Sequence, residues 1–249
     1  MISCYCPDVI DNPPLPFRGA PPDRDAWVLA QAFRFSREKW RNELPDPAMW
    51  PPELEAAPES DREGQQIVDR RTVLRIGERA TEPLGAVQTL VAAGVWGTGT
   101  GARGRHRRLL ALIQGVEVIG NLLATAAQKL HADGPLAAYT YLHRDGGNLI
   151  KYLGASFGTK FLYFSGYGRY SGDQQPLILD ENVATALNRL CGVGWSTSQY
   201  AEYLSLAHDW AKEWHASPDV IERVLFSVGK VSKTYPLVIS IFTGLPLGE

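Results

Sequence analysis

Apolar residues recur with the helical period of 3.6 along most of the chain beyond residue 65. Strand patterns are scarce, and only residues 177–179 and 237–242 look extended. The longest apolar segment can divide at Gly115 and Gly120. We therefore expect a mainly α fold. The predicted helices cover residues 68–80, 83–93, 107–130, 200–214 and 218–229.

Prolines are frequent in the first 65 residues, where apolar runs are few. Long regular elements are not expected there, because proline lacks a backbone N–H and clashes inside helices. Residues 25–43 are the exception and predict one helix that ends before Pro45. Its apolar face would comprise Trp27, Ala30, Phe33 and Trp40. We expect an irregular, Pro-rich region over residues 1–65, packed on a helical domain over residues 66–249.

The charge balance excludes a strong overall electrostatic field. Of the 249 residues, 25 are Lys or Arg and 27 are Asp or Glu, which gives a formal net charge of −2. Binding to a polyanion such as nucleic acid would therefore depend on local clusters of basic residues.

The three cysteines, Cys4, Cys6 and Cys191, predict neither a disulfide framework nor a metal site. Their number is odd, and they do not supply the four ligands of a structural zinc site or an iron-sulfur cluster. The first residues lack the basic start and apolar run of a signal peptide, and no apolar stretch reaches the ~20 residues that span a bilayer. We expect a cytoplasmic protein with no metal, no cofactor and no membrane role.

Residues 95–108 combine glycines with a cluster of basic residues. The glycines Gly99, Gly101 and Gly104 match GxGxxG, and Glu117 stands where an acid that binds ribose would be. A dinucleotide fold would also require repeated strand-helix-strand units, which the pattern does not show. The same segment suits contact with the phosphates of a polynucleotide. The residues expected to make that contact are Trp96, Thr98, Arg103, Arg105 and Arg107.

Residues 152–164 predict a helical hairpin. An apolar helix is expected to end at Gly154, and a second to begin at Thr159 after a turn of about four residues. Lys160 then lies in the first turn of an apolar helix. Desolvation disfavours the charged form of a lysine, and a neutral amine is a nucleophile.

Residues 175–187 bring an acidic residue to the start of a helix. A short apolar stretch is followed by Asp180, whose carboxylate is expected to accept backbone N–H bonds as an N-cap. Capping alone would explain this aspartate.

Together, Gly158-Thr159-Lys160 and Asp180, 20 residues downstream, resemble the helix-hairpin-helix DNA glycosylases. The similarity is closest to the 8-oxoguanine glycosylase-like group and covers about residues 95–190. In that branch the hairpin reads approximately Leu-Pro-Gly-Val-Gly-Thr-Lys. This chain departs from it, with residues 154–156 reading Gly-Ala-Ser and Phe157 at the tip. Ser156 replaces a glycine of that hairpin, whose backbone usually contacts a phosphate in this family.

The resemblance implies a monomeric enzyme that binds double-stranded DNA and flips a modified base out of the duplex. Lys160 would attack C1′ and displace the base, Asp180 would stabilise the positive charge that develops on the sugar, and β-elimination could follow. Residues 156–158, which are Ser156, Phe157 and Gly158, would contact DNA. Wedge or stacking candidates are Trp96, Phe157, Tyr167 and Tyr170, and the base pocket would include Tyr163 and Phe164.

The substrate base stays open between an oxidised purine such as 8-oxoguanine, as in repair, and a bulky hypermodified base such as glycosylated hydroxymethylcytosine, as in defence against phage. Two other functions also remain. A DNA-binding module without catalysis would not need Lys160, and a dinucleotide-dependent oxidoreductase would depend on Gly99 and Gly101.

Overall fold

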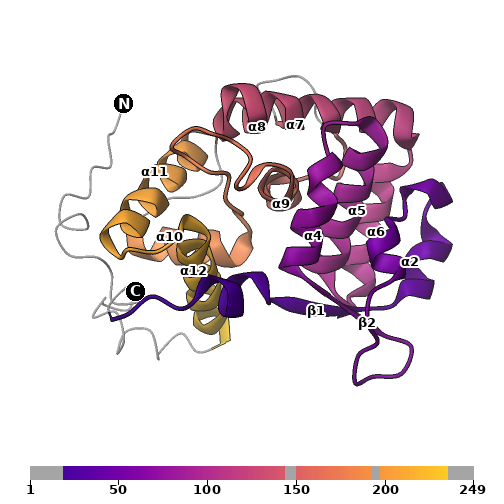
Figure 1. Cartoon of the computed structure of the whole chain (residues 1–249), viewed down its shortest axis with the longest axis horizontal. Helices are drawn as coiled ribbons and strands as arrows, with labels where there is room; N and C mark the ends of the chain where they lie inside the picture. Colours follow the sequence, from indigo (N-terminus) through magenta and orange to yellow (C-terminus); the bar gives the residue numbers. More distant parts are fainter. Residues whose placement is uncertain (1–18, 144–149, 192–196, 235–249) are drawn as a thin grey trace. The chain divides into compact units, whose positions relative to one another are not determined.

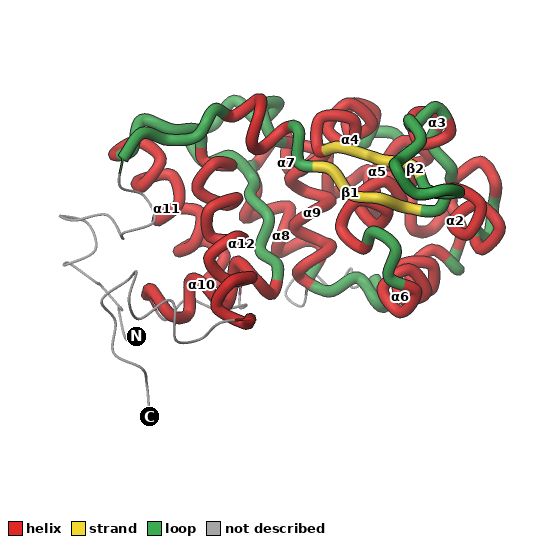
Figure 2. Tube along the Cα trace, turned by 90° about the horizontal axis from the view of Figure 1, so that it is seen from below, coloured by secondary structure: helices red, strands yellow, loops and turns green. Residues whose placement is uncertain are grey.

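The computed structural model describes residues 19–143, 150–191 and 197–234 (Figure 1). These residues are mainly helical, as the pattern predicts, and Figure 2 shows one short two-stranded sheet among them. The chain forms two compact units. The larger comprises residues 29–178, and the smaller comprises residues 1–28 with 179–249. The predicted strand at 237–242 lies outside the described residues.

The larger unit begins with a β-ribbon. Strand β1 (Ala32–Phe35) pairs antiparallel with β2 (Gln66–Asp69), so that Phe33 lies opposite Val68. Three short helices connect the strands and bury Trp40, Met49 and Leu54. These helices are α2 (Arg37–Glu43), η3 (Pro47–Met49) and α3 (Pro52–Glu55).

The single helix predicted over 25–43 is wrong. The structure has a π-helical turn η2 (Asp25–Leu29), then β1, then α2. Pairing with β2 holds residues 32–35 extended, and the Ser36 hydroxyl accepts the Lys39 N–H (3.4 Å) to start a new helix. The partner strand lies more than 30 residues away in sequence, so local periodicity did not reveal it.

Helix α4 (Arg70–Ile76) begins two residues later than predicted, because residues 68 and 69 belong to β2. Asp69 caps α4 by accepting the Thr72 N–H at 2.8 Å, and the 3₁₀-helix η4 (Gly77–Arg79) continues it. Helix α5 (Pro83–Thr98) follows and runs past the predicted end at residue 93. Every residue from 85 to 96 of α5 is buried, so α5 is the central helix of this unit, in contact with α4, α7 and α9.

The helix predicted over 107–130 is divided in the structure. The break lies at Gly115, one of the two glycines at which the sequence indicated a division. Helix α6 (Ala102–Leu112) ends before Gly115, whose φ of +81° favours glycine. The π-turn η5 (Val116–Gly120) then leads directly into α7 (Asn121–Asp133), so Gly120 does not interrupt the helix. Gly120 instead permits close packing, since a Cβ there would lie 2.7 Å from the Pro83 carbonyl oxygen.

Helices α8 (Pro135–Leu142) and α9 (Ala155–Gly166) complete the larger unit and contact each other. Residues 177–179 are buried but form no strand in the described chain. No single described helix is long and apolar enough to cross a bilayer; residues 103–112 and 116–133 pass that test only when taken together across an 88° bend.

The smaller unit contains α10 (Glu181–Cys191), α11 (Thr197–Glu213) and α12 (Pro218–Thr234). Helix α12 begins at Pro218, as predicted. The segment before η2 is tied to this unit by an ion pair in which the Arg24 Nη2 lies 2.8 Å from the fully buried Asp219 carboxylate. The indole N–H of Trp214 also donates to the Gly19 carbonyl at 2.7 Å.

Candidate active site

Lys160 lies in the second turn of α9, where only 3% of its surface is exposed. The predicted hairpin turn is misplaced. The preceding helix α8 ends at Leu142, and Gly154 is the N-cap of α9, with its carbonyl accepting the N–H groups of Phe157 and Gly158. Ser156, Phe157 and Gly158 therefore belong to the first turn of α9 and not to a loop.

The Lys160 ammonium group points back along α9 toward its first turn. Its Nζ lies 3.3 Å from the Ser156 Oγ and 3.4 Å from the Ser156 carbonyl oxygen, and 5.1 Å from the centre of the Phe157 ring. The hydroxyl, the carbonyl and the face of the aromatic ring each stabilise a cation. None of these three groups carries a negative charge. These contacts with Ser156 and Phe157 orient the amine.

The stem of Lys160 packs on α5 at Gly97. A Cβ at Gly97 would lie 3.0 Å from Cε and 3.1 Å from Cδ of Lys160, and 3.1 Å from the Phe157 ring. Gly97 therefore leaves the space that the lysine side chain occupies. No local sequence pattern indicates this role, because the contact joins segments more than 60 residues apart.

With Lys160 as the nucleophile that the resemblance to the glycosylases implies, we expect Gly97→Ala to fold and to slow base release. The added methyl must displace Lys160 or Phe157 by a few tenths of an ångström. Misplacement of a reacting group by about 1 Å can cost roughly 10²-fold in rate, so we expect a loss of about 10-fold. Single-turnover base release would measure it, with thermal unfolding as the control for folding. An unchanged rate would contradict the role of Gly97.

The ring of Phe157 contacts both Lys160 and the partly buried Arg108. The Arg108 guanidinium is 3.9 Å from the centre of the Phe157 ring, a cation–π contact that fixes the ring. Burial, with a further effect from the nearby Arg107, lowers the pKa of Arg108 to about 10. Arg108 therefore contacts the same aromatic ring as Lys160.

Gly158 provides close packing with α8. A Cβ at Gly158 would lie 2.6 Å from the Cε1 atom of His143, and the centre of the His143 ring lies 4.1 Å from that of Tyr139, with the two rings tilted by 45°. Burial raises the pKa of Tyr139 to about 12. Burial also lowers the pKa of His143 below its ordinary 6.5, opposed by a backbone contact at Leu142.

Because the pKa of His143 is lowered, we predict that the larger unit loses stability in acid. The unfolded chain takes up a proton at about pH 6.5 and the folded chain at lower pH, so the stabilisation is present above 6.5 and is lost as pH falls below it. His208 contributes in the same direction in the smaller unit, because burial lowers its pKa. Denaturant unfolding at pH 7.5 and 5.5 should show a smaller loss for His143→Phe than for the wild type. The exposed-histidine variant His106→Gln should behave as wild type; equal losses in all three would refute the prediction.

Asp180 caps α10, as the sequence predicts. Its Oδ1 accepts the N–H of Asn182 at 3.0 Å and of Val183 at 3.1 Å, and 9% of the residue is exposed. Asp180 belongs to the smaller unit and Lys160 to the larger one. The pairing of the two residues therefore stays a prediction.

Three residues expected to contact DNA or the base lie in the core of the larger unit. Trp96 is 3% exposed, and its indole N–H donates to the Gln31 carbonyl at 3.0 Å. Tyr163 and Phe164 are fully buried. The Arg70 guanidinium lies about 5 Å from the rings of Trp96 and Tyr163. The rings of all three residues therefore contact other groups of the protein interior. This favours a core role for Trp96, Tyr163 and Phe164.

The basic residues of α6 separate into two groups. Arg103, His106 and Arg107 are exposed. Arg105 forms an ion pair in which its Nη2 lies 2.8 Å from the Glu43 carboxylate. The exposed group is the part of the predicted DNA contact that stays available in this structure.

The glycines of GxGxxG do not stand in a dinucleotide fold. They follow helix α5 rather than a strand, and the described part of the larger unit has only the two-stranded β-ribbon. Gly104 packs on Thr98, since a Cβ there would lie 2.5 Å from the Thr98 methyl. A dinucleotide site requires a strand before the glycines, so this alternative is not supported. No group of three or more His, Cys, Asp or Glu that could hold a metal ion is found in residues 19–143, 150–191 and 197–234.

Comparison with known families identifies the chain. Residues 26–226 match the family model described as "Putative 8-oxoguanine DNA glycosylase OGG-like protein". The chain belongs to this OGG-like family. The match runs from η2 to about the middle of α12 and so includes both Lys160 and Asp180. Comparisons with curated proteins and with solved structures give no match.

Proposed function

We propose that this OGG-like protein is a DNA glycosylase whose nucleophile is Lys160. The observation that carries the proposal is a lysine buried in α9, packed on Gly97 and oriented by Ser156 and Phe157, inside the region that matches the family. A buried lysine is costly for stability, which argues for a role in function.

In the proposed reaction the Lys160 amine, after it has lost a proton, attacks C1′ of the flipped nucleotide. The C1′–N bond breaks, and its electron pair leaves with the base, which then takes up a proton. Loss of a second proton from nitrogen and opening of the sugar ring give an imine between Lys160 and C1′. Asp180 would stabilise the positive charge that develops on the sugar. β-Elimination from this imine would cleave the strand.

The exposed basic residues of α6 would bind the DNA backbone. Arg107→Ala should weaken binding to any duplex and reduce the slope of log Kd against log salt by about 1, because one phosphate contact is lost. Arg105→Ala is the matched control and should change the slope less, since Arg105 is paired with Glu43. Fluorescence anisotropy over a salt series measures both. Equal slopes for Arg107→Ala and the wild type would remove α6 from the interface.

The substrate is proposed to be an oxidised purine or a bulky glycosylated cytosine. The protein would be incubated with an 8-oxoguanine duplex, with phage DNA that carries glycosylated hydroxymethylcytosine, and with an unmodified duplex, each in the presence of borohydride. A covalent adduct on one modified DNA names the substrate class. Failure to form an adduct, with no abasic sites on either DNA, would contradict the glycosylase proposal for these bases and favour a non-catalytic DNA-binding module.

A further inference from the structure

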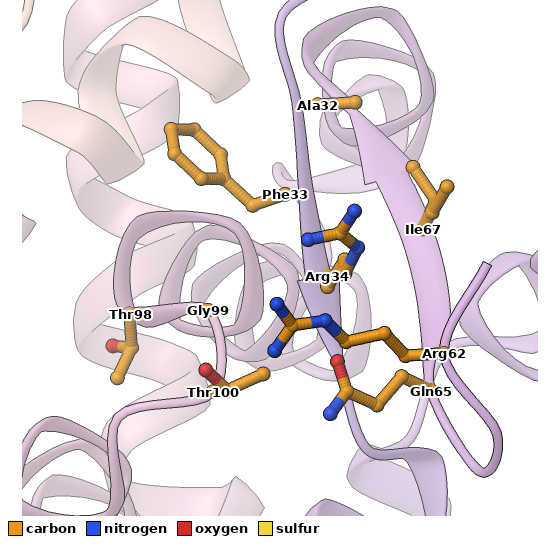
Figure 3. Close-up of a pocket in the computed structure, with 9 residues that line it drawn as sticks. All are labelled: Ala32, Phe33, Arg34, Arg62, Gln65, Ile67, Thr98, Gly99 and Thr100. Carbon is orange, nitrogen blue, oxygen red and sulfur yellow. The ribbon is translucent and has the colours of Figure 1, made fainter. Parts of the chain in front are cut away.

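A polar pocket lies in the larger unit, between the β-ribbon and the end of α5 (Figure 3). Its volume is about 530 Å³, within the range of sites for small molecules. Residues from β1, from the turn before β2 and from the end of α5 line it. Lys160, Ser156 and Phe157 do not line it, so the pocket is separate from the proposed reaction centre.

The walls of the pocket carry groups of two kinds. Figure 3 shows the side chains of Arg62, Gln65 and Thr100 gathered on one side, with Phe33 on another wall. The Phe33 ring is only partly buried, and it makes an edge-to-face contact with Trp96, with the ring centres 5.2 Å apart. The pocket thus offers an aromatic side chain together with polar groups.

Two polar atoms of the wall are unsatisfied. The Gln65 Oε1 and the Thr98 Oγ1 are both buried without a hydrogen-bond partner among the described residues. A buried polar atom without a partner is costly. A ligand with hydrogen-bonding groups could relieve this cost after small rotations of the two side chains.

The pocket also has a net positive charge. Arg34 is paired with Asp61 at 2.8 Å, whereas Arg62 forms no ion pair with any described residue. One cationic guanidinium therefore remains for a ligand, and arginine binds phosphate through paired N–H groups.

The pocket thus combines an aromatic ring, hydrogen-bonding side chains and a guanidinium that is outside any ion pair with the described residues. These groups fit a nucleotide, which has a planar base with polar edges and a phosphate. We propose that this pocket binds a second nucleotide of the bound DNA, distinct from the one that Lys160 attacks. The inference rests on the proposed function. Its geometric basis is that Gly97 contacts Lys160 while the next residue, Thr98, lines the pocket, so two consecutive residues of α5 connect the two sites.

The test uses duplexes in which the fluorescent base 2-aminopurine replaces one base at a time, beside or opposite the modified nucleotide. Binding should raise the fluorescence at one such position, because the base leaves the stack. Arg62→Ala and the isosteric Thr98→Val should remove this signal, and Arg62→Ala should weaken affinity roughly 10-fold. Arg75→Ala, an exposed arginine of α4 outside the pocket, is the matched control and should keep the signal.

Borohydride trapping on the same duplexes separates the two proposals. A fluorescence response without a trapped adduct would support the pocket and contradict catalysis by Lys160. A trapped adduct with no response at any position, or a response that Arg62→Ala and Thr98→Val leave unchanged, would overturn the pocket proposal. Titration with free deoxynucleoside monophosphates tests whether the pocket binds a free nucleotide instead of a nucleotide of DNA. If a free nucleotide bound in a way that depends on Arg62, and no position in DNA gave a fluorescence response, the pocket would be a site for a free nucleotide. This result would overturn our assignment to DNA.

Discussion

Lys160→Met is expected to abolish base release and borohydride trapping. Methionine keeps the apolar stem that packs on Gly97 but removes the amine. Loss of a nucleophile costs roughly 10³-fold or more in rate, whereas folding should be retained because the variant no longer buries an amine. Single-turnover base release on the substrate duplex, with thermal unfolding alongside, measures both effects.

Lys151→Met is the matched control for this variant. Lys151 is exposed and stands shortly before α9, so its loss should leave the rate within about twofold of wild type, as surface changes away from a site usually do. If Lys160→Met released the base at the wild-type rate, the nucleophile would be another group, and the proposed reaction would be wrong.

Substitutions of Asp180 are expected to separate its effect on stability from its effect on the rate of base release. Asparagine and aspartate are about equally good N-caps, so Asp180→Asn should keep the two bonds to the Asn182 and Val183 N–H groups and change stability little. Asp180→Ala removes the cap and should lower stability by about 1 kcal/mol. Both variants remove the carboxylate and should slow base release by roughly 10²-fold, the cost of losing one electrostatic stabiliser of a transition state.

Denaturant unfolding and single-turnover rates on the same samples test this separation. A stable Asp180→Asn with the wild-type rate would show that Asp180 only caps α10. The structure already accounts for that capping role, so the rate of the Asn variant decides whether the carboxylate also acts in the reaction.

The sequence predicted best the elements that depend on neighbouring residues. The helices after residue 65 follow local periodicity. The Asp180 cap follows from the place of this residue before α10. The break at Gly115 was predictable because the residue is a glycine, and the structure gives it a φ of +81°. Each of these features is determined within a few residues of chain.

The errors arose where distant segments meet. Strand β1 is extended because β2 pairs with it, and Trp96 is a core residue because Gln31, Phe33 and Phe164 surround its indole. The start of α9 was placed too late because Gly154 could as well end a helix as cap one. The fit of Lys160 on Gly97 joins α5 and α9, and no local pattern carries that information.

The central claim is that Lys160 forms the covalent bond to DNA. Its most direct test is mass spectrometry of the adduct trapped by borohydride, after digestion of the protein and the DNA. We predict that the sugar remnant is found on the peptide that contains Lys160, attached to its Nζ. A remnant on another lysine or on the N-terminus would contradict the assignment of Lys160 as the nucleophile.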